Sequence, residues 1–298
     1  MVYIGETGKG NSIEFVESLQ PPFPIEEKWI LTVSTLKGCP VRCRFCDAGG
    51  FYKGILTKDE IISQVDYLVT RRFPEKKVPV KKFKIQFARM GEPSFNQNVL
   101  EVLECLPELY DAPGLIPSFS TVAPASRHDF FERLLEIKNL QYARNFQLQF
   151  SVHSTDDQAR DWLIPVKKWS FEEIAAYGRR FADGGGKKIT LSFALAEGLP
   201  VDPNLLSKCF SPDAFLIKIT PVNPTIQAAR NRISSLVPHP DGERIISSLR
   251  GAGYEVVLSI GELEENRIGS NCGMYIAAYE KTRQLTGGSY TYKLKRLS

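Results

Sequence analysis

Short apolar segments alternate with amphipathic segments along most of this 298-residue chain. Phe83, Ile85 and Phe87 alternate with polar neighbours, which is the pattern of a strand buried on one face. Apolar residues recur at helical spacing after Thr57, which forms a capping box with Glu60. Six or seven such units in series predict parallel strands with helical crossovers. The chain is therefore expected to be an α/β barrel or partial barrel.

The pattern predicts strands at residues 29–34, 83–87, 118–120, 146–152, 189–195, 215–220 and 254–260. It predicts helices after residue 57 and at 96–106, 126–137, 170–181 and 243–250. The helix at 96–106 is expected to stop before Pro107, because proline has no N–H for the helix ladder. We expect an N-terminal β-hairpin extension over residues 1–28 and one catalytic domain over residues 29–298.

The composition is that of a soluble globular protein, with 43% hydrophobic and 24% charged residues. It excludes a disordered, collagen-like or coiled-coil chain. No apolar run approaches the ~18 residues that span a bilayer, and the first residues lack the layout of a signal peptide. We therefore expect a cytoplasmic protein without a membrane partner. The net charge of +4 permits an RNA partner but does not require one.

Three of the six cysteines lie close together, as Cys39, Cys43 and Cys46 with the spacing C-x3-C-x2-C. Three thiolates on one loop can hold three irons of a [4Fe–4S] cluster and leave the fourth iron open for a cofactor. A structural zinc site normally has a fourth protein ligand at a paired spacing, and none is nearby. Three buried cysteines or a zinc knuckle are the structural alternatives.

The other candidate residues each follow a predicted strand. They are Gly91-Glu92-Pro93, Ser120-Thr121, Ser151-Val152-His153 and Pro221-Val222-Asn223-Pro224. In parallel α/β folds the chemistry sits on the loops at the carboxyl ends of the strands. The sequence thus predicts one site at that edge, which also receives the cysteine loop. Cys105 and Cys209 are expected to be packing residues of helices.

Cys39-x3-Cys43-x-Phe45-Cys46 resembles the signature of radical S-adenosylmethionine (SAM) enzymes, and Gly91-Glu92-Pro93 resembles their GEP motif. The resemblance implies a radical SAM partial (β/α)6-type barrel with a [4Fe–4S] cluster and SAM as cofactors. Cys39, Cys43 and Cys46 would be the cluster ligands. Glu92 would hold the SAM ammonium, and Phe45 would cover the adenine. A reductant such as flavodoxin or ferredoxin would supply the electron that cleaves SAM to a 5′-deoxyadenosyl radical.

Ordered landmarks between residues 10 and 280, including Asn271-Cys272-Gly273, resemble one branch, the RlmN/Cfr-type methyltransferases of adenine carbons in RNA. The resemblance implies that Cys272 carries a methyl group and that Glu14 is a general base. It implies SAM contacts from Gly91, Glu92, Ser120, Ser151, Val152, His153 and Asn223. The branch's resolving cysteine is replaced here by Thr32, and the branch's N-terminal helical domain has no counterpart among these residues.

The first hypothesis is methylation of an sp2 carbon of an adenine-like or RNA substrate through a methylated cysteine. The alternative is a non-methylating radical SAM reaction on a small molecule, with the same scaffold. A third possibility, from a different class, is a non-catalytic iron–sulfur or SAM-binding protein.

Overall fold

A nine-stranded sheet forms the centre of the protein. The computed structural model describes residues 1–8, 10–19, 22–183, 185–260, 276 and 279. The strand order is β1-β2-β3-β6-β7-β8-β9-β10-β11, and β4 and β5 form a separate two-stranded sheet. The strand bounds are β1 Val2–Glu6, β2 Ser12–Leu19, β3 Trp29–Val33, β4 Leu36–Gly38, β5 Tyr52–Ile55, β6 Phe83–Phe87, β7 Leu115–Thr121, β8 Gln147–Ser151, β9 Ile189–Leu195, β10 Phe215–Pro221 and β11 Val256–Leu258.

The strands from β3 to β11 in this sheet are all parallel to their neighbours. The hairpin of β1 and β2 is antiparallel and joins the edge of the sheet through pairing of β2 with β3. Among the described residues β1 does not pair with β11, so the sheet stays open. The prediction of an α/β fold with a parallel sheet is confirmed, and its division at residue 28 stays a prediction.

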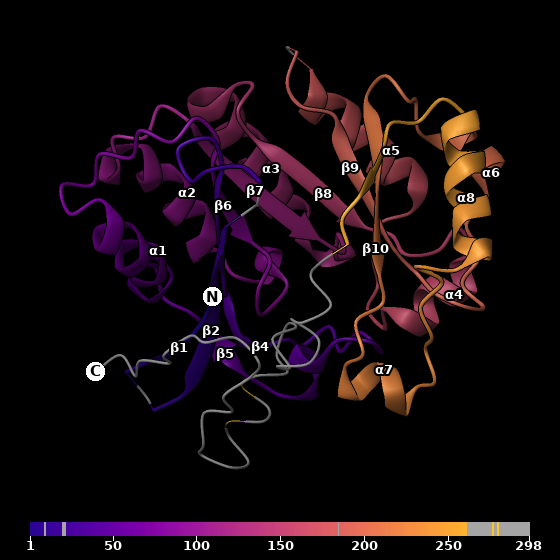
Figure 1. The fold of residues 1–298 in the computed structure, drawn as a ribbon, viewed down its shortest axis with the longest axis horizontal. Helices are drawn as coiled ribbons and strands as arrows, with labels where there is room; N and C mark the ends of the chain where they lie inside the picture. The colour runs from indigo at the N-terminus through magenta and orange to yellow at the C-terminus, as the bar shows by residue number, and fades with distance from the viewer. Residues whose placement is uncertain (9, 20–21, 184, 261–275, 277–278, 280–298) are drawn as a thin grey trace.

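Helices cover the outer face of the curved sheet (Figure 1). Their bounds are α1 Lys58–Arg72, α2 Asn98–Leu109, α3 His128–Ile137, α4 Asp157–Leu163, α5 Phe171–Ala182, α6 Pro203–Cys209, α7 Ile226–Arg230 and α8 Pro240–Gly251. No helix in the described part of the chain is both long and apolar enough to cross a bilayer.

The two faces of the sheet differ in chemistry because side chains alternate along each strand. On the outer face Phe83, Ile85 and Phe87 are fully buried in a single apolar core that includes the helices. On the inner face Gln149 Nε2 donates to the hydroxyl oxygens of Ser118 (3.2 Å) and Ser120 (3.1 Å). The outer face therefore stabilises the fold, and the inner face is free to carry polar groups.

Helix α2 continues past Pro107, so the predicted end before this residue is wrong. A proline at this position leaves the carbonyl of Leu103 without its helical donor. The Tyr142 hydroxyl, far away in the sequence, donates a hydrogen bond to that carbonyl. The tertiary contact satisfies the acceptor that the proline leaves, and the helix runs on to Leu109.

The capping box of α1 generates a stability prediction. Thr57 Oγ1 accepts from Glu60 N at 3.1 Å, and Glu60 Oε2 accepts from Thr57 N at 2.9 Å. Thr57→Ala should lower the free energy of unfolding by about 1 kcal/mol, because one N–H of the first turn loses its acceptor. Urea unfolding followed by circular dichroism measures the effect. Ser63→Ala, an exposed change on the same helix, should stay within about 0.5 kcal/mol of the wild type; an equal loss in both variants would contradict the capping argument.

Candidate functional site

The cysteine loop leaves β4 and returns through β5, directly after the first parallel strand. Cys39 N donates to Phe51 O at 3.0 Å. Gly38 has φ +87°, and a Cβ there would lie 2.0 Å from the Phe51 carbonyl oxygen. The hairpin therefore needs glycine immediately before the first cysteine, both for its left-handed backbone and for the close approach of the two strands.

Side chains from the segment after β10 fasten the cysteine loop. Asp47, buried, accepts from the backbone N–H groups of Gln227 (2.9 Å) and Ile226 (3.1 Å) at the start of α7. Thr225 Oγ1 donates to Phe45 O at 2.8 Å, and Asn231 Nδ2 donates to Arg44 O at 2.8 Å. Loops about 180 residues apart in sequence are thus held together at the carboxyl edge of the sheet.

The three thiols are half-buried on this loop. Cys39 and Cys43 contact an apolar cluster that includes Val122 and Val222, and Cys39 and Cys46 contact a second one that includes Met90. Burial raises the pKa of Cys39 to about 11, and burial also raises the pKa of Cys43 well above its ordinary range. Within the described residues, no three Cys, His, Asp or Glu side chains are already grouped as metal ligands.

The residues of the loop nevertheless fit an iron–sulfur cluster. The backbone N–H groups of Val41, Arg42 and Glu92 donate toward the Cys39 sulfur, which favours the thiolate. Apolar side chains surround Cys39 and Cys43, and exclusion of water is one of the factors that tune such clusters. Cys105 and Cys209, the other cysteines in the described part of the chain, lie in α2 and α6. Three thiols at one strand end therefore remain the available ligand set.

Glu92 is buried and accepts four hydrogen bonds. Its Oε1 accepts from Ser94 N (3.2 Å), Ser94 Oγ (2.7 Å) and Thr121 Oγ1 (2.6 Å), and its Oε2 accepts from Val122 N (2.8 Å). Burial is the larger effect and raises the pKa of Glu92, although these hydrogen-bond donors act in the opposite direction. The carboxylate ties the loop after β6 to the end of β7, and Oε2 keeps one acceptor position. The preceding Gly91, with φ +99°, packs so closely that a Cβ would lie 2.4 Å from Leu36 Cγ.

His153 and Phe45 lie against each other, with ring centroids 5.0 Å apart in an edge-to-face arrangement. Ala194 N donates to His153 Nδ1 at 3.0 Å, so the proton of the neutral imidazole is on Nε2. Burial, followed by the charge of Arg160, lowers the pKa of His153 to about 4. The ring is thus a neutral group with one fixed donor beside the cysteine loop.

The remaining predicted SAM contacts are less closely connected. Ser120 is half-buried and accepts from Gln149 on the inner face. Val152 is fully buried, and its N–H donates to Ser192 O at 3.0 Å. Ser151 is half-buried at the end of β8, and Asn223 is exposed after β10. All four residues lie at the carboxyl ends of β7, β8 and β10.

Glu14 lies on β2, fully buried, with Oε1 2.9 Å from Arg89 Nε. Its Oε2 accepts from Ile276 N at 3.2 Å. Ile276 is fully buried and packs with Ala48 and Met90, next to Cys39 and Cys46. Cys272 lies outside the described residues. Arg89 and Asp47 are site residues that sequence reasoning missed; only their positions beside Met90 and Cys46 could have drawn attention to them.

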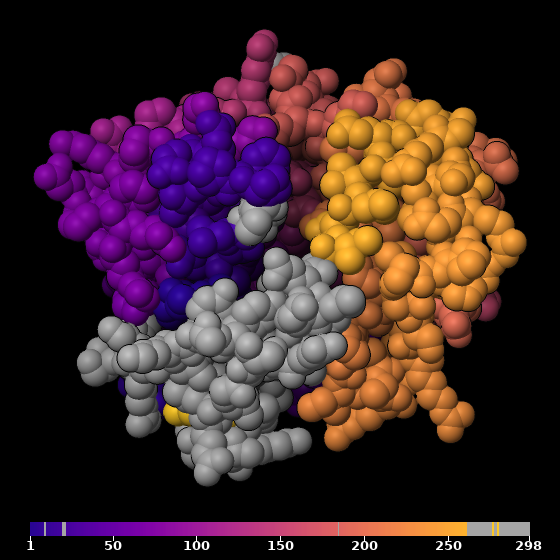
Figure 2. All heavy atoms as spheres, in the orientation of Figure 1, coloured from indigo at the N-terminus to yellow at the C-terminus, as the bar shows by residue number. Residues whose placement is uncertain are grey.

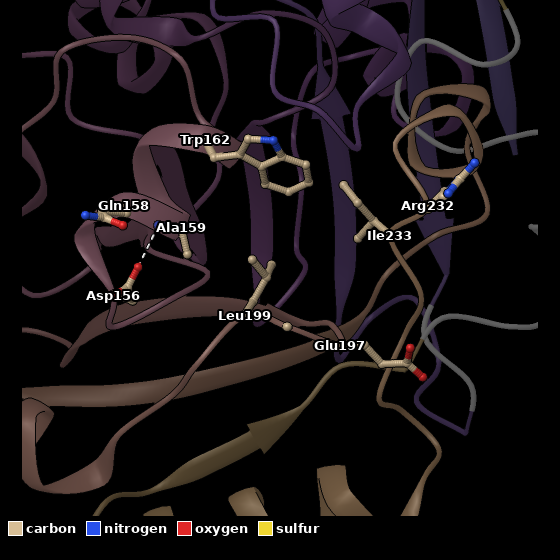
Figure 3. Close-up of a pocket in the computed structure, with 9 residues that line it drawn as sticks. Asp156, Gln158, Ala159, Trp162, Glu197, Leu199, Arg232 and Ile233 are labelled. Atoms are coloured by element: carbon tan, nitrogen blue, oxygen red, sulfur yellow. Dashed lines mark hydrogen bonds between the residues drawn. The ribbon is translucent and has the colours of Figure 1, made fainter.

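A pocket of about 440 Å³ opens beside the cysteine loop (Figure 3). Arg44 Nε donates to Trp162 O at 2.7 Å, and its guanidinium lies 5.2 Å from the centre of the Trp162 ring. The cysteine loop therefore fixes the position of Trp162, which forms one wall of the pocket. The lining residues, from α4 and the loops after β9 and α7, are Asp156, Gln158, Ala159, Trp162, Glu197, Gly198, Leu199, Arg232 and Ile233.

The chain is similar in sequence to proteins described as probable dual-specificity RNA methyltransferase RlmN. The protein from Thermotoga maritima is 28% identical over 260 residues, covering 83% of this chain and 67% of the relative. That from Nostoc punctiforme is 29% identical over 246 residues, covering 79% of this chain and 64% of the relative. The chain thus spans about two thirds of the length of the curated relatives it matches. No family model matches the sequence.

The fold is similar to a solved radical SAM methyltransferase from Sphaerobacter thermophilus, with TM-score 0.72, 22% identity, and coverage of 92% of this chain and 76% of that one. It is also similar to Streptococcus suis SuiB bound to precursor peptide SuiA, with TM-score 0.53, 14% identity, and coverage of 80% and 49%. At these identities the likeness concerns the fold.

The environment of His153 predicts a pH dependence. Because its folded pKa of about 4 is below the unfolded value near 6.5, the unfolded chain binds the proton more readily between these values. The stability is therefore full above about pH 6.5 and declines as the pH falls toward 4. Between pH 7.5 and pH 5, His153 should account for about 2 kcal/mol of the loss in unfolding free energy.

His153→Asn removes the titrating ring, and asparagine tolerates the left-handed backbone of this position, φ +64°. Urea unfolding at the two pH values should show a smaller loss for this variant by about 2 kcal/mol. His128→Asn, at an exposed position, is the matched control and should behave as the wild type. Equal pH dependence in all three proteins would reject the assignment.

Proposed function

We infer that this chain, a relative of the RlmN-type radical SAM methyltransferases, binds a [4Fe–4S] cluster through Cys39, Cys43 and Cys46 and uses SAM as its cofactor. The observation that carries the proposal is the loop itself. Three thiols stand on one hairpin at the carboxyl edge of the sheet, with backbone N–H groups directed to the Cys39 sulfur. A bound cluster would supply one electron for the reductive cleavage of SAM, which gives methionine and a 5′-deoxyadenosyl radical.

The protein's own residues would position SAM beside that loop. Oε2 of Glu92 has an acceptor position for the methionine ammonium, and the four bonds it already takes part in hold the carboxylate in place. Phe45 and His153 form an edge-to-face pair that can flank the adenine, with the imidazole Nε2–H as donor. Gly91 permits the close turn, and Ser120, Ser151, Val152 and Asn223 surround the same edge.

The proposed reaction is methylation of an sp2 carbon of adenine in RNA through Cys272. A thiolate is the side chain nucleophilic enough to take a methyl group from SAM. Glu14 anchors the chain at Ile276, four positions beyond Cys272, against the hydrophobic cluster of the cysteine loop. This anchoring of Ile276 supports a role for Cys272 in the reaction.

Glu14 is also the proposed general base that removes the ring proton. Its carboxylate faces the Arg89 guanidinium at 2.9 Å. An opposite charge at this distance favours the ionised form, which is the form a base needs before it accepts a proton. When the carboxylate accepts the proton, its ion pair with Arg89 weakens. Proton transfer also requires that the substrate proton lie within hydrogen-bond distance of Oε1 or Oε2.

The alternative function is a non-methylating radical SAM reaction on a small molecule. Thr32 favours it, because a hydroxyl cannot form the disulfide that would release a covalent RNA adduct. Its Oγ1 donates to Gln86 Oε1 at 3.1 Å on the inner face of the sheet. In both cases a flavodoxin- or ferredoxin-type reductant is the proposed electron donor.

Anaerobic reconstitution with iron, sulfide, SAM and a chemical reductant tests the cofactor assignment. Cys39→Ala, Cys43→Ala and Cys46→Ala should each lose the brown absorbance of the cluster, or keep a three-iron form, and should form no 5′-deoxyadenosine. Cys105→Ala and Cys209→Ala are matched controls on helices and should keep both properties. A loop variant that still cleaves SAM at the wild-type rate would reject the ligand set.

Mass spectrometry of the purified protein tests the methylation hypothesis. Cys272 should carry the additional mass of one CH2 group on its peptide, and Cys272→Ala should abolish methyl transfer while SAM cleavage remains. With an RNA substrate, the wild type should accumulate a covalent adduct that Thr32→Cys releases, because a thiol restores disulfide exchange. An unmodified Cys272, together with turnover by Cys272→Ala, would favour the small-molecule alternative instead.

A further inference from the structure

Two lysines stand on the inner, polar face of the sheet, within strands β6 and β10 and before the loops that carry the proposed SAM contacts. Lys84 alternates with Phe83 and Ile85 on β6, and Lys218 alternates with Ile217 and Ile219 on β10. The apolar neighbours are fully buried in the outer core. Since successive side chains of a strand point to opposite faces, both lysines are directed to the inner face.

Neither ammonium group forms an ion pair with a described residue. Lys84 Nζ donates to Gln147 Oε1 at 2.5 Å, which is a neutral acceptor. Burial and the positive charges of Lys218, Lys28, Lys187 and Lys82, in that order, lower the pKa of Lys84 to about 8. Burial, followed by the charge of Lys28, also lowers the pKa of Lys218. Both side chains are half-buried, and partial desolvation of an ammonium group without a partner of opposite charge is costly.

The other three lysines whose charges act on Lys84 lie at the amino ends of strands. Lys28 and Lys82 directly precede β3 and β6, and Lys187 lies two residues before β9. These ends are at the opposite edge of the sheet from the cysteine loop. The lysines therefore form a separate group, here called the lysine cluster: Lys28, Lys82, Lys84, Lys187 and Lys218.

A buried hydroxyl lies next to this cluster. Thr190, 1% exposed, has no hydrogen-bond partner for Oγ1 among the described residues. It pairs with Gln149 on β8 and Leu216 on β10, so it is the diagonal neighbour of Lys218 on the same face. A buried hydroxyl without a partner costs free energy unless something supplies one.

The space-filling view shows a hollow on one face of the protein (Figure 2). In its upper half the surface is hollowed between the indigo N-terminal strands and the yellow and orange segments around β10, β11 and α8. In the sequence, Lys28 directly precedes β3 and Lys218 lies on β10. A small anion, or one group of a larger polyanion, can enter this hollow.

We propose that the lysine cluster, with Thr190 and Gln147, is a binding site for a phosphate group. A phosphate carries up to two negative charges and several acceptor oxygens, which matches two unpaired ammonium groups and a free hydroxyl donor. It removes the charge repulsion between Lys84 and Lys218 and gives the Thr190 hydroxyl an acceptor. A phosphorylated small molecule and the backbone of RNA both present this group. The site is distinct from the SAM site and does not rest on the proposed function.

Calorimetric titration with inorganic pyrophosphate, against sodium chloride of the same ionic strength, tests the site. The wild type should bind pyrophosphate saturably. Lys84→Met and Lys218→Met should each weaken the affinity by roughly tenfold or more, because each removes a charged hydrogen bond. Lys208→Met removes an exposed lysine of α6 and should leave the affinity unchanged. Replacing an unpaired, half-buried charge with a hydrophobic side chain of similar length should not lower the unfolding temperature in phosphate-free buffer.

A short single-stranded RNA then separates the two sources of phosphate. Displacement of pyrophosphate by the RNA assigns the site to the nucleic-acid backbone. Saturable pyrophosphate binding that the RNA does not displace assigns it to a small phosphorylated molecule. The proposal is overturned if the wild type binds no pyrophosphate beyond the chloride control. It is also overturned if the folded Lys84→Met and Lys218→Met variants both bind as the wild type does.

Discussion

The division of the sheet into an apolar outer face and a polar inner face is the constraint on which the rest of the structure depends. Helices bury the outer face, where Phe87, Phe119 and Phe150 are almost fully excluded from water. Burial of such side chains supplies the main driving force for folding. Because the outer face supplies this stabilisation, the inner face does not have to be apolar. It can hold hydroxyls, amides and ammonium groups such as that of Lys218.

Two buried carboxylates, Asp47 and Glu92, organise the carboxyl edge by accepting hydrogen bonds from N–H and O–H groups. Asp47 accepts backbone N–H groups at the start of α7, and Glu92 joins the loop after β6 to the end of β7. Each connects segments that are far apart in sequence. A buried carboxylate is stabilised by several hydrogen-bond donors that it satisfies at once. These contacts and the hydrogen bonds of its own hairpin together fix the position of the cysteine loop.

The lysine cluster and the cysteine loop occupy opposite edges of one sheet, so the protein offers two chemically different sites. One is rich in thiols and backbone N–H groups, the other in ammonium groups. An inner face with both sites can receive an anionic molecule at one end and expose another part of it to the chemistry at the other.

Local residue patterns were enough to predict the parallel α/β fold, the capping box at Thr57, and the placement of the candidate residues after strand ends. These features depend on alternation and on contacts between near neighbours, which the order of residues determines directly. Tertiary structure alone decided that α2 continues through Pro107, that Glu14 faces Arg89, and that Lys84 and Lys218 share one interior. Each of these depends on a partner that is distant in sequence, and the partner is known only when the strands have been assembled into a sheet.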